Sequence, residues 1–461
     1  MVELYERSAS ELARLIQEKA CSSKDVVQAH IDRIAEVNEQ VNAITVVLDE
    51  SALVAAEEAD SSAPAGPLHG VPFTVKENID CLGSATTNGV PALENALPGA
   101  DSPIVERMKS AGAIPIARTN LPELALRLST SNPLRGSTLN PWNKALTPGG
   151  SSGGDAVALA TGMTPFGLGN DIGGSLRNPA YCCGITALKP TVGRIPSATS
   201  MEPSDPGFAG QYMAVQGPMA RRVEDLKLGL SILAGRDSRD PRSVDVPITG
   251  LPAKPKHAGL VTNLASGTIP DETVREIERA GRILENNGWT VEEVDPPEIE
   301  RINEIWCYVF STDFSVLAPA IQPFIEEPLY QFIVKFCERF DPARISNYLI
   351  HSERSRLART WSTLFDEMPV IIGPTWCNTP WPVDADMHPE TGIDTFLESL
   401  RFITPGNVLG FPSVALPIGL NKTGLPTGIQ IYADLWREDL CLQVGGLLEK
   451  EATITAPINP V

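Results

Sequence analysis

The chain has 461 residues, and its 42% hydrophobic content is enough for a large core and excludes global disorder. Its 37 basic and 57 acidic residues give a formal charge of −20, which repels phosphate backbones and anionic lipid surfaces, so we expect no nucleic acid and no membrane among its partners. Its eight scattered cysteines form no Cys-x-x-Cys pair and its first residues lack the apolar core of a secretory signal, so we expect a cytoplasmic protein with reduced thiols.

The first elements along the chain are expected to be helices. Ser8 and Glu11 form a Ser-x-x-Glu capping box, which is typical of a helix start, and apolar residues follow at helical spacing. A second helix is expected to begin at Ser22. A stretch of small and polar residues over 61–67 ends this part of the chain. We therefore expect an N-terminal helical layer over about residues 8–60.

Strands and helices alternate through much of the remaining chain. The apolar run 71–75 has the character of a strand, and residues 102–121 read as a helix followed by a strand. Strand, helix and strand follow one another again over residues 257–294. This alternation is typical of α/β proteins. We expect a single domain over residues 1–461, built on a mixed, mostly parallel β-sheet with α-helices on both faces.

Aromatic side chains gather in a helical-looking region over about residues 300–365. Two interpretations remain open for them: packing between helices, or an apolar wall on the substrate side of an active site. The aromatic residues of the region are Trp306, Tyr308, Phe310, Phe314, Phe324, Tyr330, Phe332, Phe336, Phe340 and Tyr348.

Ser175 follows a double glycine, 173–174, where a strand-like run gives way to a turn. Glycines allow successive backbone N–H groups to converge, which is what an oxyanion hole requires, although a phosphate-binding turn would look similar. Asp171 and Arg177 flank this loop, and we expect them to form an ion pair or hydrogen-bonded network that fixes it. The predicted oxyanion-hole donors are the N–H groups of Ile172, Gly173, Gly174 and Ser175.

A serine nucleophile needs a base, and the histidines of the chain lie in no recognisable triad signature. Lys76 ends the run 71–75, and burial beside a sheet would lower its pKa enough to make it a neutral base. Glu77 is expected on the opposite face of the strand, where it need not keep Lys76 charged. An ordinary exposed or ion-paired lysine is the alternative. The histidines are His30, His69, His257, His351 and His388.

Ser151 lies in a second glycine-rich loop, 149–154. Its hydroxyl can both donate and accept, so it can relay a proton between Ser175 and Lys76. A helix N-cap is the alternative role, because small, helix-compatible residues follow at 156–160. We expect no cofactor and no metal, since no cluster of His, Cys and Asp has metal-ligand spacing.

These motifs resemble those of the amidase signature family. The Gly-Gly-Ser-Ser-Gly-Gly loop, the segment Asp171–Arg177 and the run around Lys76 occur in the family's order. Separations of 75 and 24 residues also match the family and select Ser151 rather than Ser152. The resemblance implies a mixed sheet flanked by helices, with Lys76 as base, Ser151 as a relay that follows a cis peptide bond, and Ser175 as nucleophile.

The resemblance covers a signature core over about residues 67–235 and a C-terminal part over 406–430. Departures from the family's pattern are few, and they leave the three catalytic candidates intact. They put only local packing in doubt. The departures are Asn170 where Thr or Ser is common, Ala187 where Gly is common, and the additional Cys182.

The resemblance further implies hydrolysis of an amide C–N bond by water through an acyl-enzyme on Ser175, which yields a carboxylic acid and an amine or ammonia. We expect small apolar or aryl amides as substrates, with esters and carbamates as further possibilities, and a homo-oligomer is possible. Loops beside a rigid scaffold often carry specificity. The substrate-binding candidates therefore come from the loop after the core, and they are Met201, Phe208 and Tyr212.

Three alternatives remain open. Within the family, the chain could be the A subunit of a glutamyl-tRNA amidotransferase. Residues 149–153 also fit the Gly-x-Ser-x-Gly elbow of α/β-hydrolases, with Ser151 as nucleophile and one of His257, His351 and His388 as base. A non-enzymatic binder could use the glycine loops as anion nests, although the loop lacks the Gly-Lys-[Ser/Thr] ending of a P-loop.

Overall fold

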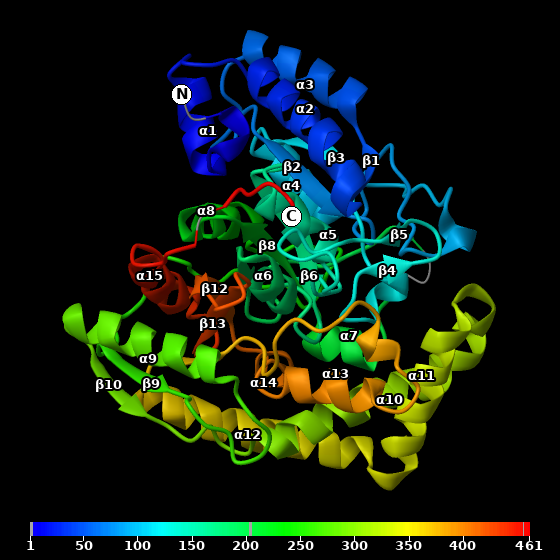
Figure 1. Ribbon diagram of the computed structural model, residues 1–461, viewed down its shortest axis with the longest axis vertical. Coiled ribbons are helices and arrows are strands. Elements are labelled where there is room, and N and C mark those ends of the chain that lie inside the picture. The colour runs from blue at the N-terminus through cyan, green and yellow to red at the C-terminus, as the bar shows by residue number, and fades with distance from the viewer. Residues whose placement is uncertain (1–2, 202–204, 455) are drawn as a thin grey trace.

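The computed structural model of the protein describes residues 3–201, 205–454 and 456–461. The described residues form an 11-stranded sheet, in the order β1-β3-β2-β6-β8-β7-β12-β13-β11-β9-β10, and a separate two-stranded sheet, β4-β5 (Figure 1). The strands are β1 (Ile44–Val47), β2 (Pro72–Lys76), β3 (Ile114–Thr119), β4 (Ser131–Asn132), β5 (Gly136–Ser137), β6 (Phe166–Asp171), β7 (Thr186–Lys189), β8 (Val215–Ala220), β9 (His257–Leu260), β10 (Thr290–Glu293), β11 (Val370–Pro374), β12 (Ser413–Leu420) and β13 (Pro426–Ala433).

Helices cover both faces of the large sheet. No helix among the described residues is long and apolar enough to span a bilayer. The helices are α1 (Ala9–Gln17), α2 (Ser23–Val41), α3 (Asp49–Ser61), α4 (Pro103–Ser110), α5 (Gly153–Ala160), α6 (Arg177–Cys183), α7 (Phe208–Met213), α8 (Val223–Leu233), α9 (Asp271–Asn286), α10 (Ile299–Ile321), α11 (Glu327–Arg339), α12 (Asn347–Glu367), α13 (Gly392–Leu400), α14 (Thr404–Val408) and α15 (Glu438–Glu449).

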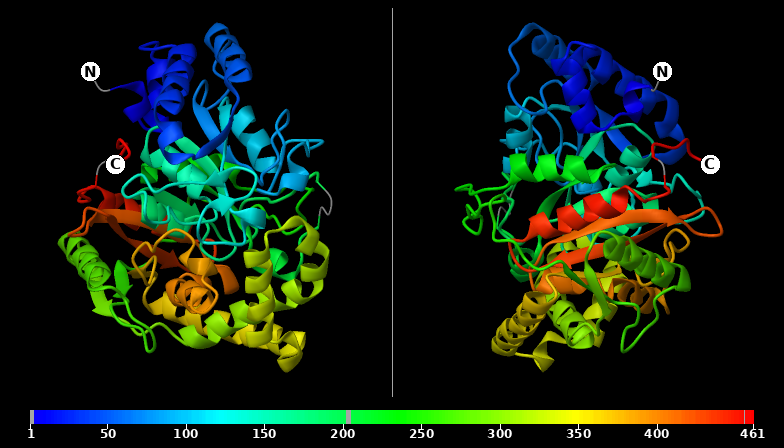
Figure 2. Two further views of the ribbon diagram at one scale, coloured as in Figure 1. Left: turned by 45° about the vertical axis from the view of Figure 1, so that its right-hand side comes forward. Right: turned by 90° about the vertical axis from the view of Figure 1, so that its left-hand side faces the viewer.

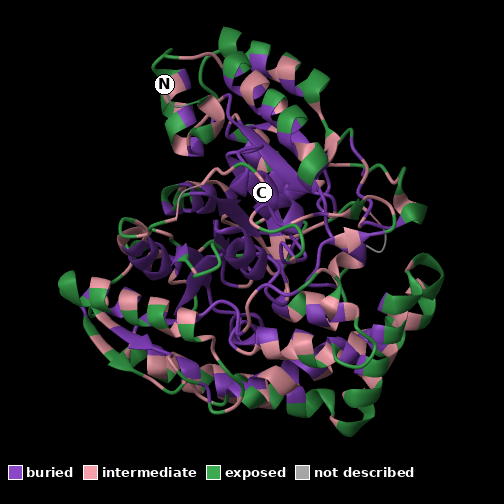
Figure 3. Ribbon diagram, in the orientation of Figure 1, coloured by how far each residue is buried: buried purple, intermediate pink, exposed green. Residues whose placement is uncertain are grey.

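The sheet separates two hydrophobic cores. Along β11, Val370 and Ile372 belong to one core and Ile371 to the other, as expected when successive strand side chains point to opposite faces. Helices α4, α8, α9 and α15 pack into the first core, and α5, α6 and α10 pack into the second. Figure 3 shows the sheet and its central helices as the buried part of the molecule, with mixed burial on the outer helices.

The predicted mixed α/β sheet with helices on both faces is confirmed. Among the described strands of the large sheet, four pairings are parallel and six are antiparallel, so the parallel share is smaller than expected. Parallel pairings join β3-β2-β6 and β11-β9-β10. Antiparallel pairings join the central strands of the sheet, β6-β8-β7-β12-β13-β11. Only residues 421–425 connect β12 to β13, and a connection of that length makes a hairpin, not a crossover.

The N-terminal layer contains a strand as well as the expected helices. Ser8 and Ser22 both cap helices through capping boxes, as the sequence pattern predicts for Ser8. Between α2 and α3, β1 pairs with β3 at the edge of the sheet. This layer and helices α10–α12 lie at opposite ends of the molecule, shown in blue and in yellow-green in Figures 1 and 2.

Candidate active site

Two strands that carry candidate residues end at the same edge of the sheet. β2 ends at Lys76 and β6 ends at Asp171, and the strands are parallel neighbours with Thr74 opposite Gly167. The carboxyl ends of parallel neighbours lie side by side, and ligands of open α/β sheets bind at such edges. The topology therefore brings Lys76 and the loop after Asp171 together.

Lys76 is fully buried, and its amine has three hydrogen-bond partners. Nζ lies 2.7 Å from Ser151 Oγ, 3.0 Å from Ser152 Oγ and 2.7 Å from Asn170 Oδ1. Asn170 is held in turn, because its Nδ2 donates to Asn78 Oδ1 at 2.9 Å. The described partners of the amine include no carboxylate, so no direct ion pair fixes it in the charged form.

Burial lowers the pKa of Lys76 to about 7, and the negative charges of Asp155 and Asp171 oppose this shift. Burial in turn raises the pKa of Asp155, whose carboxylate accepts hydrogen bonds from Thr74 at 3.0 Å and Thr119 at 2.6 Å. A lysine with a pKa near 7 is about half neutral at neutral pH, which is what a general base requires.

The neighbouring Glu77 does not pair with Lys76. Its carboxylate lies 2.8 Å from Arg135, consistent with the expectation that it need not keep Lys76 charged. An exposed or ion-paired Lys76 is excluded, because the residue is buried and its described contacts are neutral.

The loop that carries Ser151 is held by Asn178 of α6. The peptide bond between Gly150 and Ser151 is cis. Asn178 Oδ1 accepts a hydrogen bond from Gly150 N–H at 2.9 Å, and its Nδ2 donates to the Gly150 carbonyl at 2.6 Å. α5 begins at Gly153, and Ser152 at its N-cap makes no capping hydrogen bond with its side chain. Both serine hydroxyls contact the buried amine instead of capping the helix.

Ser175 lies in the turn between β6 and α6 and is 5% exposed. Gly174 has a φ of +99°, in the left-handed region that favours glycine. A Cβ at Gly174 would lie 2.7 Å from Ile403, and one at Gly173 would lie 2.7 Å from Trp306. Both positions of the double glycine therefore exclude a side chain on steric grounds.

The three catalytic candidates are only partly joined by hydrogen bonds. Lys76 contacts Ser151, and Ser152 N–H donates to the Ser175 carbonyl at 3.2 Å. The described hydrogen bonds do not include one between the Ser151 and Ser175 hydroxyls. Catalytic hydrogen bonds are often long or poorly aligned in a site without substrate.

The predicted nest of N–H donors needs one correction. Gly174 N–H donates to Asp171 Oδ1 at 2.8 Å, so it is not free to bind an oxyanion. None of the described loop hydrogen bonds uses the N–H of Ile172, Gly173 or Ser175. The Ile172 carbonyl accepts a hydrogen bond from Trp306 Nε1 at 3.2 Å, so the aromatic region also supports this loop.

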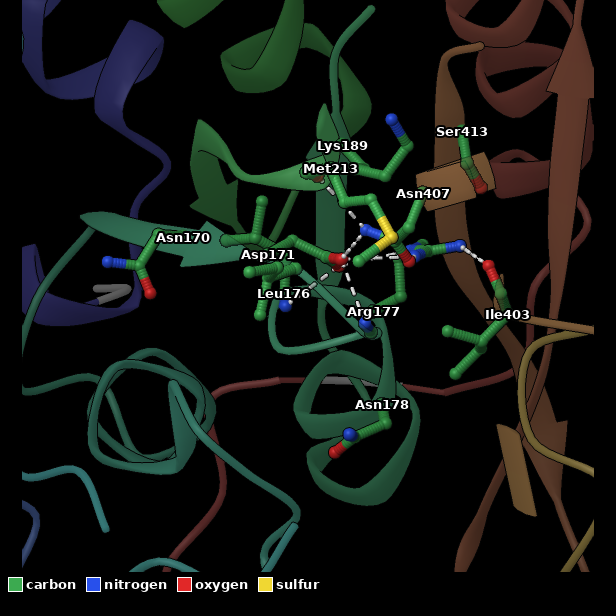
Figure 4. A network of polar contacts seen from close by, with 12 residues as sticks. Asn170, Asp171, Leu176, Arg177, Asn178, Lys189, Met213, Ile403, Asn407 and Ser413 are labelled. Atoms are coloured by element: carbon green, nitrogen blue, oxygen red, sulfur yellow. Dashed lines mark hydrogen bonds and ion pairs between the residues drawn. The ribbon is translucent and has the colours of Figure 1, made fainter. Parts of the chain in front are cut away.

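The predicted ion pair between Asp171 and Arg177 is confirmed, and both side chains are fully buried. Burial alone would raise the pKa of Asp171, but the charge of Arg177 and hydrogen bonds from Arg177 and Asn407 hold it well below its ordinary value. Asp171 also accepts from Leu176 N–H at 3.1 Å and from Gly174 N–H. Figure 4 shows this carboxylate enclosed by Arg177, Asn407 and Leu176, with Asn170 pointing away. The hydrogen bonds from Gly174 N–H and Leu176 N–H to Asp171 therefore fix the backbone on both sides of Ser175.

Two cavities meet at this site. The first, called the aromatic pocket, has a volume of about 30 Å³, and Ser175 lies in its wall. Aromatic rings make up much of the rest of the wall, so these side chains pack between helices and also line a cavity beside Ser175. Their role as a wall for the substrate stays a prediction. The rings are those of Trp306, Phe310, Phe314, Phe332, Phe336 and Phe396.

The second cavity, called the polar chamber, has a volume of about 320 Å³, and Ser151 and Asn170 lie in its wall. Ala125, Leu126 and Ile172 separate the two cavities together with Phe310, because these residues line both. Further polar wall residues of the chamber are Asn78, Asp80, Ser102, Ser197, Thr199 and Gln216.

The predicted substrate-binding residues lie elsewhere. Phe208 packs against Tyr212 and His351, with ring centroids 4.8 and 5.6 Å away, and Arg354 lies over the Tyr212 ring. Met201, Phe208 and Tyr212 do not line the aromatic pocket or the polar chamber, and residues 202–204 of this loop lie outside the described part of the chain. Their role in substrate binding remains a prediction.

The histidines do not contact the candidate serines in the described structure. His257 and His351 hydrogen-bond the Glu367 carbonyl and Tyr212, and His388 contacts Thr391. The partner of Ser151 is Lys76, so the α/β-hydrolase alternative lacks its base. Among the described residues, no group of three or more His, Cys, Asp or Glu side chains could hold a metal ion.

Several residues of the site lie outside the motifs that predict it. Asn170 was noted only as a departure from the family's pattern, yet it contacts Lys76. Its place at the end of a strand, next to Asp171, was the signal that could have identified it. Ala125 and Phe396 come from distant parts of the chain, and the sequence carries no local signal for either.

Comparisons with known proteins identify the family of this chain. The amidase family model matches residues 25–442. The indoleacetamide hydrolase of Bradyrhizobium diazoefficiens is 36% identical over 466 residues, which cover 98% of this chain and 88% of that protein. The A subunit of the glutamyl-tRNA(Gln) amidotransferase of Geobacillus stearothermophilus is 32% identical over 498 residues and 97% of each chain.

A solved structure has the same architecture. A bacterial aryl acylamidase of the amidase signature family superposes with a TM-score of 0.83, at 26% identity, over 98% of this chain and 97% of that one. The chain therefore belongs to the amidase signature family of amide hydrolases.

Proposed function

We propose that the protein hydrolyses small aryl or other apolar amides through an acyl-enzyme on Ser175, with Ser151 as proton relay and Lys76 as base. One observation carries the proposal: the buried, uncharged environment of the Lys76 amine and its 2.7 Å contact with Ser151, beside the loop of Ser175.

The hydrogen-bond partners of Lys76 support the role of its amine as a base, because they leave its lone pair for the Ser151 hydroxyl. A neutral amine has two hydrogens and one lone pair. Asn170 Oδ1 can only accept, so it takes one hydrogen. The Ser152 hydroxyl donates to the Asn170 carbonyl at 3.4 Å and therefore accepts the second. The lone pair is then left for the hydroxyl hydrogen of Ser151.

The reaction follows from this arrangement. Ser175 Oγ bonds to the amide carbon while its proton moves to Ser151, and the Ser151 proton moves to Lys76. The negative charge on the carbonyl oxygen is stabilised by the backbone N–H groups of Ile172, Gly173 and Ser175, since that of Gly174 is bound to Asp171. The C–N bond then breaks as Ser151 protonates the leaving nitrogen and recovers a proton from Lys76. Water attacks the acyl-enzyme by the same route, which releases the acid and restores Ser175.

The aromatic pocket supports an apolar or aryl acyl group. It lies beside Ser175 and is lined by rings, which favours an apolar over a charged group next to the nucleophile. The name of the related indoleacetamide hydrolase points to the same class of substrate. The amidotransferase alternative is less well supported, because the side chain of glutamine is polar and the formal charge of −20 disfavours contact with tRNA.

Release of ammonia from phenylacetamide and indoleacetamide tests the proposal, with glutamine as the competing substrate. Ser175→Ala should abolish turnover without unfolding the protein. Ser151→Ala should lose far more activity than Ser152→Ala, which is the matched control because both hydroxyls contact Lys76. Substantial activity in Ser175→Ala, or hydrolysis of glutamine alone, would overturn it.

A further inference from the structure

We propose that Asn78 is a positioning residue of the reaction: it fixes the orientation of the Asn170 amide, and through Asn170 it keeps the lone pair of Lys76 directed at Ser151. The inference rests on the proposed function, in which the neutral Lys76 amine is the base. Among the described hydrogen bonds, the side chain of Asn78 contacts Asn170 and none of the three catalytic candidates. Its effect on the reaction therefore passes through Asn170.

The side chain of Asn170 has two chemically different ends. Its Oδ1 accepts a hydrogen bond from Lys76 Nζ at 2.7 Å, and its Nδ2 donates to Asn78 Oδ1 at 2.9 Å. If the amide were reversed, its NH₂ group would face the amine. A neutral amine pairs with an NH₂ group only by accepting, which would use the lone pair that Ser151 needs. One orientation of Asn170 therefore leaves Lys76 free to act as a base, and the other does not.

A neutral Lys76 does not select between these orientations, because an uncharged amine can both donate and accept a hydrogen bond. The other described partner of the Asn170 side chain is Asn78, whose Oδ1 can only accept. This oxygen pairs with the NH₂ end of Asn170 and leaves the oxygen end for Lys76. Asn78 therefore decides the orientation of Asn170, provided that Asn78 itself keeps its oxygen toward Asn170.

Negative charge in the polar chamber favours this orientation of Asn78. Asn78 and Asp80 both line the chamber. The Asp80 carboxylate accepts hydrogen bonds from neutral groups, and among the described residues its charge has no ion-pair partner. A carboxylate attracts the NH₂ end of an amide and repels its oxygen. The NH₂ group of Asn78 therefore faces the chamber, and its oxygen faces Asn170. The neutral partners of Asp80 are Thr86, Thr199 and Ser200.

A turn fixed by backbone hydrogen bonds holds Asn78 beside the base. Ile79 N–H donates to the Lys76 carbonyl at 2.9 Å, which closes the turn after β2. The buried Arg118 guanidinium donates to the carbonyls of Lys76 and Ile79 at 3.1 and 2.6 Å. All these acceptors are backbone carbonyls, so the turn does not depend on the side chain of Asn78. A substitution there should remove the side-chain hydrogen bond without moving Lys76.

A double-mutant cycle with Asn170→Thr tests the inference. A threonine hydroxyl both donates and accepts, so Asn78 should matter only when residue 170 is Asn. In the parent, Asn78→Leu should lower kcat for phenylacetamide by about fivefold, the effect of one lost hydrogen bond, and change KM by less than about twofold. In the Asn170→Thr background, Asn78→Leu should change kcat by less than about twofold. The rate at which a fluorophosphonate labels Ser175 should follow the same pattern.

Asn78→Asp is the matched control, because a carboxylate has the shape of the amide and can only accept. It should keep Asn170 oriented, but its charge should raise the pKa of Lys76. Its kcat should therefore be low at pH 7 and return close to the parent's at pH 10, where Asn78→Leu stays low. The charged groups already near Lys76 are unchanged in all these variants. They are Asp155 of α5, Asp171 of β6 and Arg118 of β3.

Three results would overturn the inference: a parent-like kcat in Asn78→Leu, an equal fall in kcat in both backgrounds, or no recovery of Asn78→Asp at pH 10. Should Asn78→Leu fail to fold, Asn78→Ala takes its place in the cycle. If the parent hydrolysed no amide and the fluorophosphonate did not label Ser175, the proposed function itself would fail.

Discussion

Asn170→Asp gives a direct test of the role assigned to Lys76. Asn170 Oδ1 accepts a hydrogen bond from Lys76 Nζ at 2.7 Å, so the substitution places a carboxylate in contact with the buried amine. An opposite charge at such a distance raises the pKa of a lysine by about 1–3 units. From its value of about 7, the pKa of Lys76 should rise to about 8–10.

The expected effect on rate follows from the neutral fraction of the amine. At pH 7 this fraction should fall from about one half to between about one tenth and one thousandth, so kcat/KM should fall by about five- to 500-fold and recover as the pH rises. The other charged groups near Lys76, which are Asp155 of α5, Asp171 of β6 and Arg118 of β3, are unchanged.

The assay is the pH dependence of kcat/KM for an aryl amide between pH 5 and 10. The parent should show an acid limb with a midpoint near 7, and Asn170→Asp should move that limb upward by at least about one unit. Asn170→Thr, which is neutral, should lower the rate but leave the midpoint near the parent's. If the acid limb of Asn170→Asp has the same midpoint as that of the parent, Lys76 is not the group whose deprotonation controls the rate.

Three further predictions concern residues around the site. Asp171→Asn leaves Arg177 buried without its partner, so the free energy of unfolding from urea titration should fall by about 3–5 kcal/mol, and no loss would contradict the network. The pKa of Lys76 is lowered on folding, so between about pH 7 and 10 the unfolded chain binds more protons and the stability of the parent rises with pH. Lys76→Met should therefore be more stable than the parent at pH 7 by a margin that shrinks toward pH 10; a constant margin would contradict a neutral buried amine. Trp306→Phe removes a hydrogen bond to the Ile172 carbonyl and should lower kcat by up to about tenfold with little change in KM, whereas a change in KM alone would assign Trp306 to binding.

Much of the fold was predictable because its signals are local. The capping box at Ser8 and the alternation of apolar runs with amphipathic helices correspond to observed elements. The strand β1 (Ile44–Val47) was missed, although its Val and Thr residues favour a strand, because the flanking helices dominated the pattern. The antiparallel middle of the sheet was also missed, since the pairing of distant strands leaves no local signal.

The catalytic candidates were predictable from motifs, but their environment was not. Lys76, Ser151 and Ser175 lie in distinctive glycine-rich or apolar runs. The occupied N–H of Gly174 and the contact of Asn170 with Lys76 depend on side-chain directions within one loop. The wall of the aromatic pocket comes from segments more than 250 residues apart, such as Ala125 and Phe396, which only the fold brings together.

The site of covalent labelling distinguishes Ser175 from the neighbouring serines as the nucleophile. The protein is reacted with an aryl fluorophosphonate and the modified peptide is identified by mass spectrometry, in the parent and in Ser175→Ala, Ser151→Ala and Lys76→Ala. We expect an adduct on Ser175 in the parent, none in Ser175→Ala, and slower labelling of Ser175 in the other two variants. An adduct on Ser151 or Ser152 in the parent would contradict it.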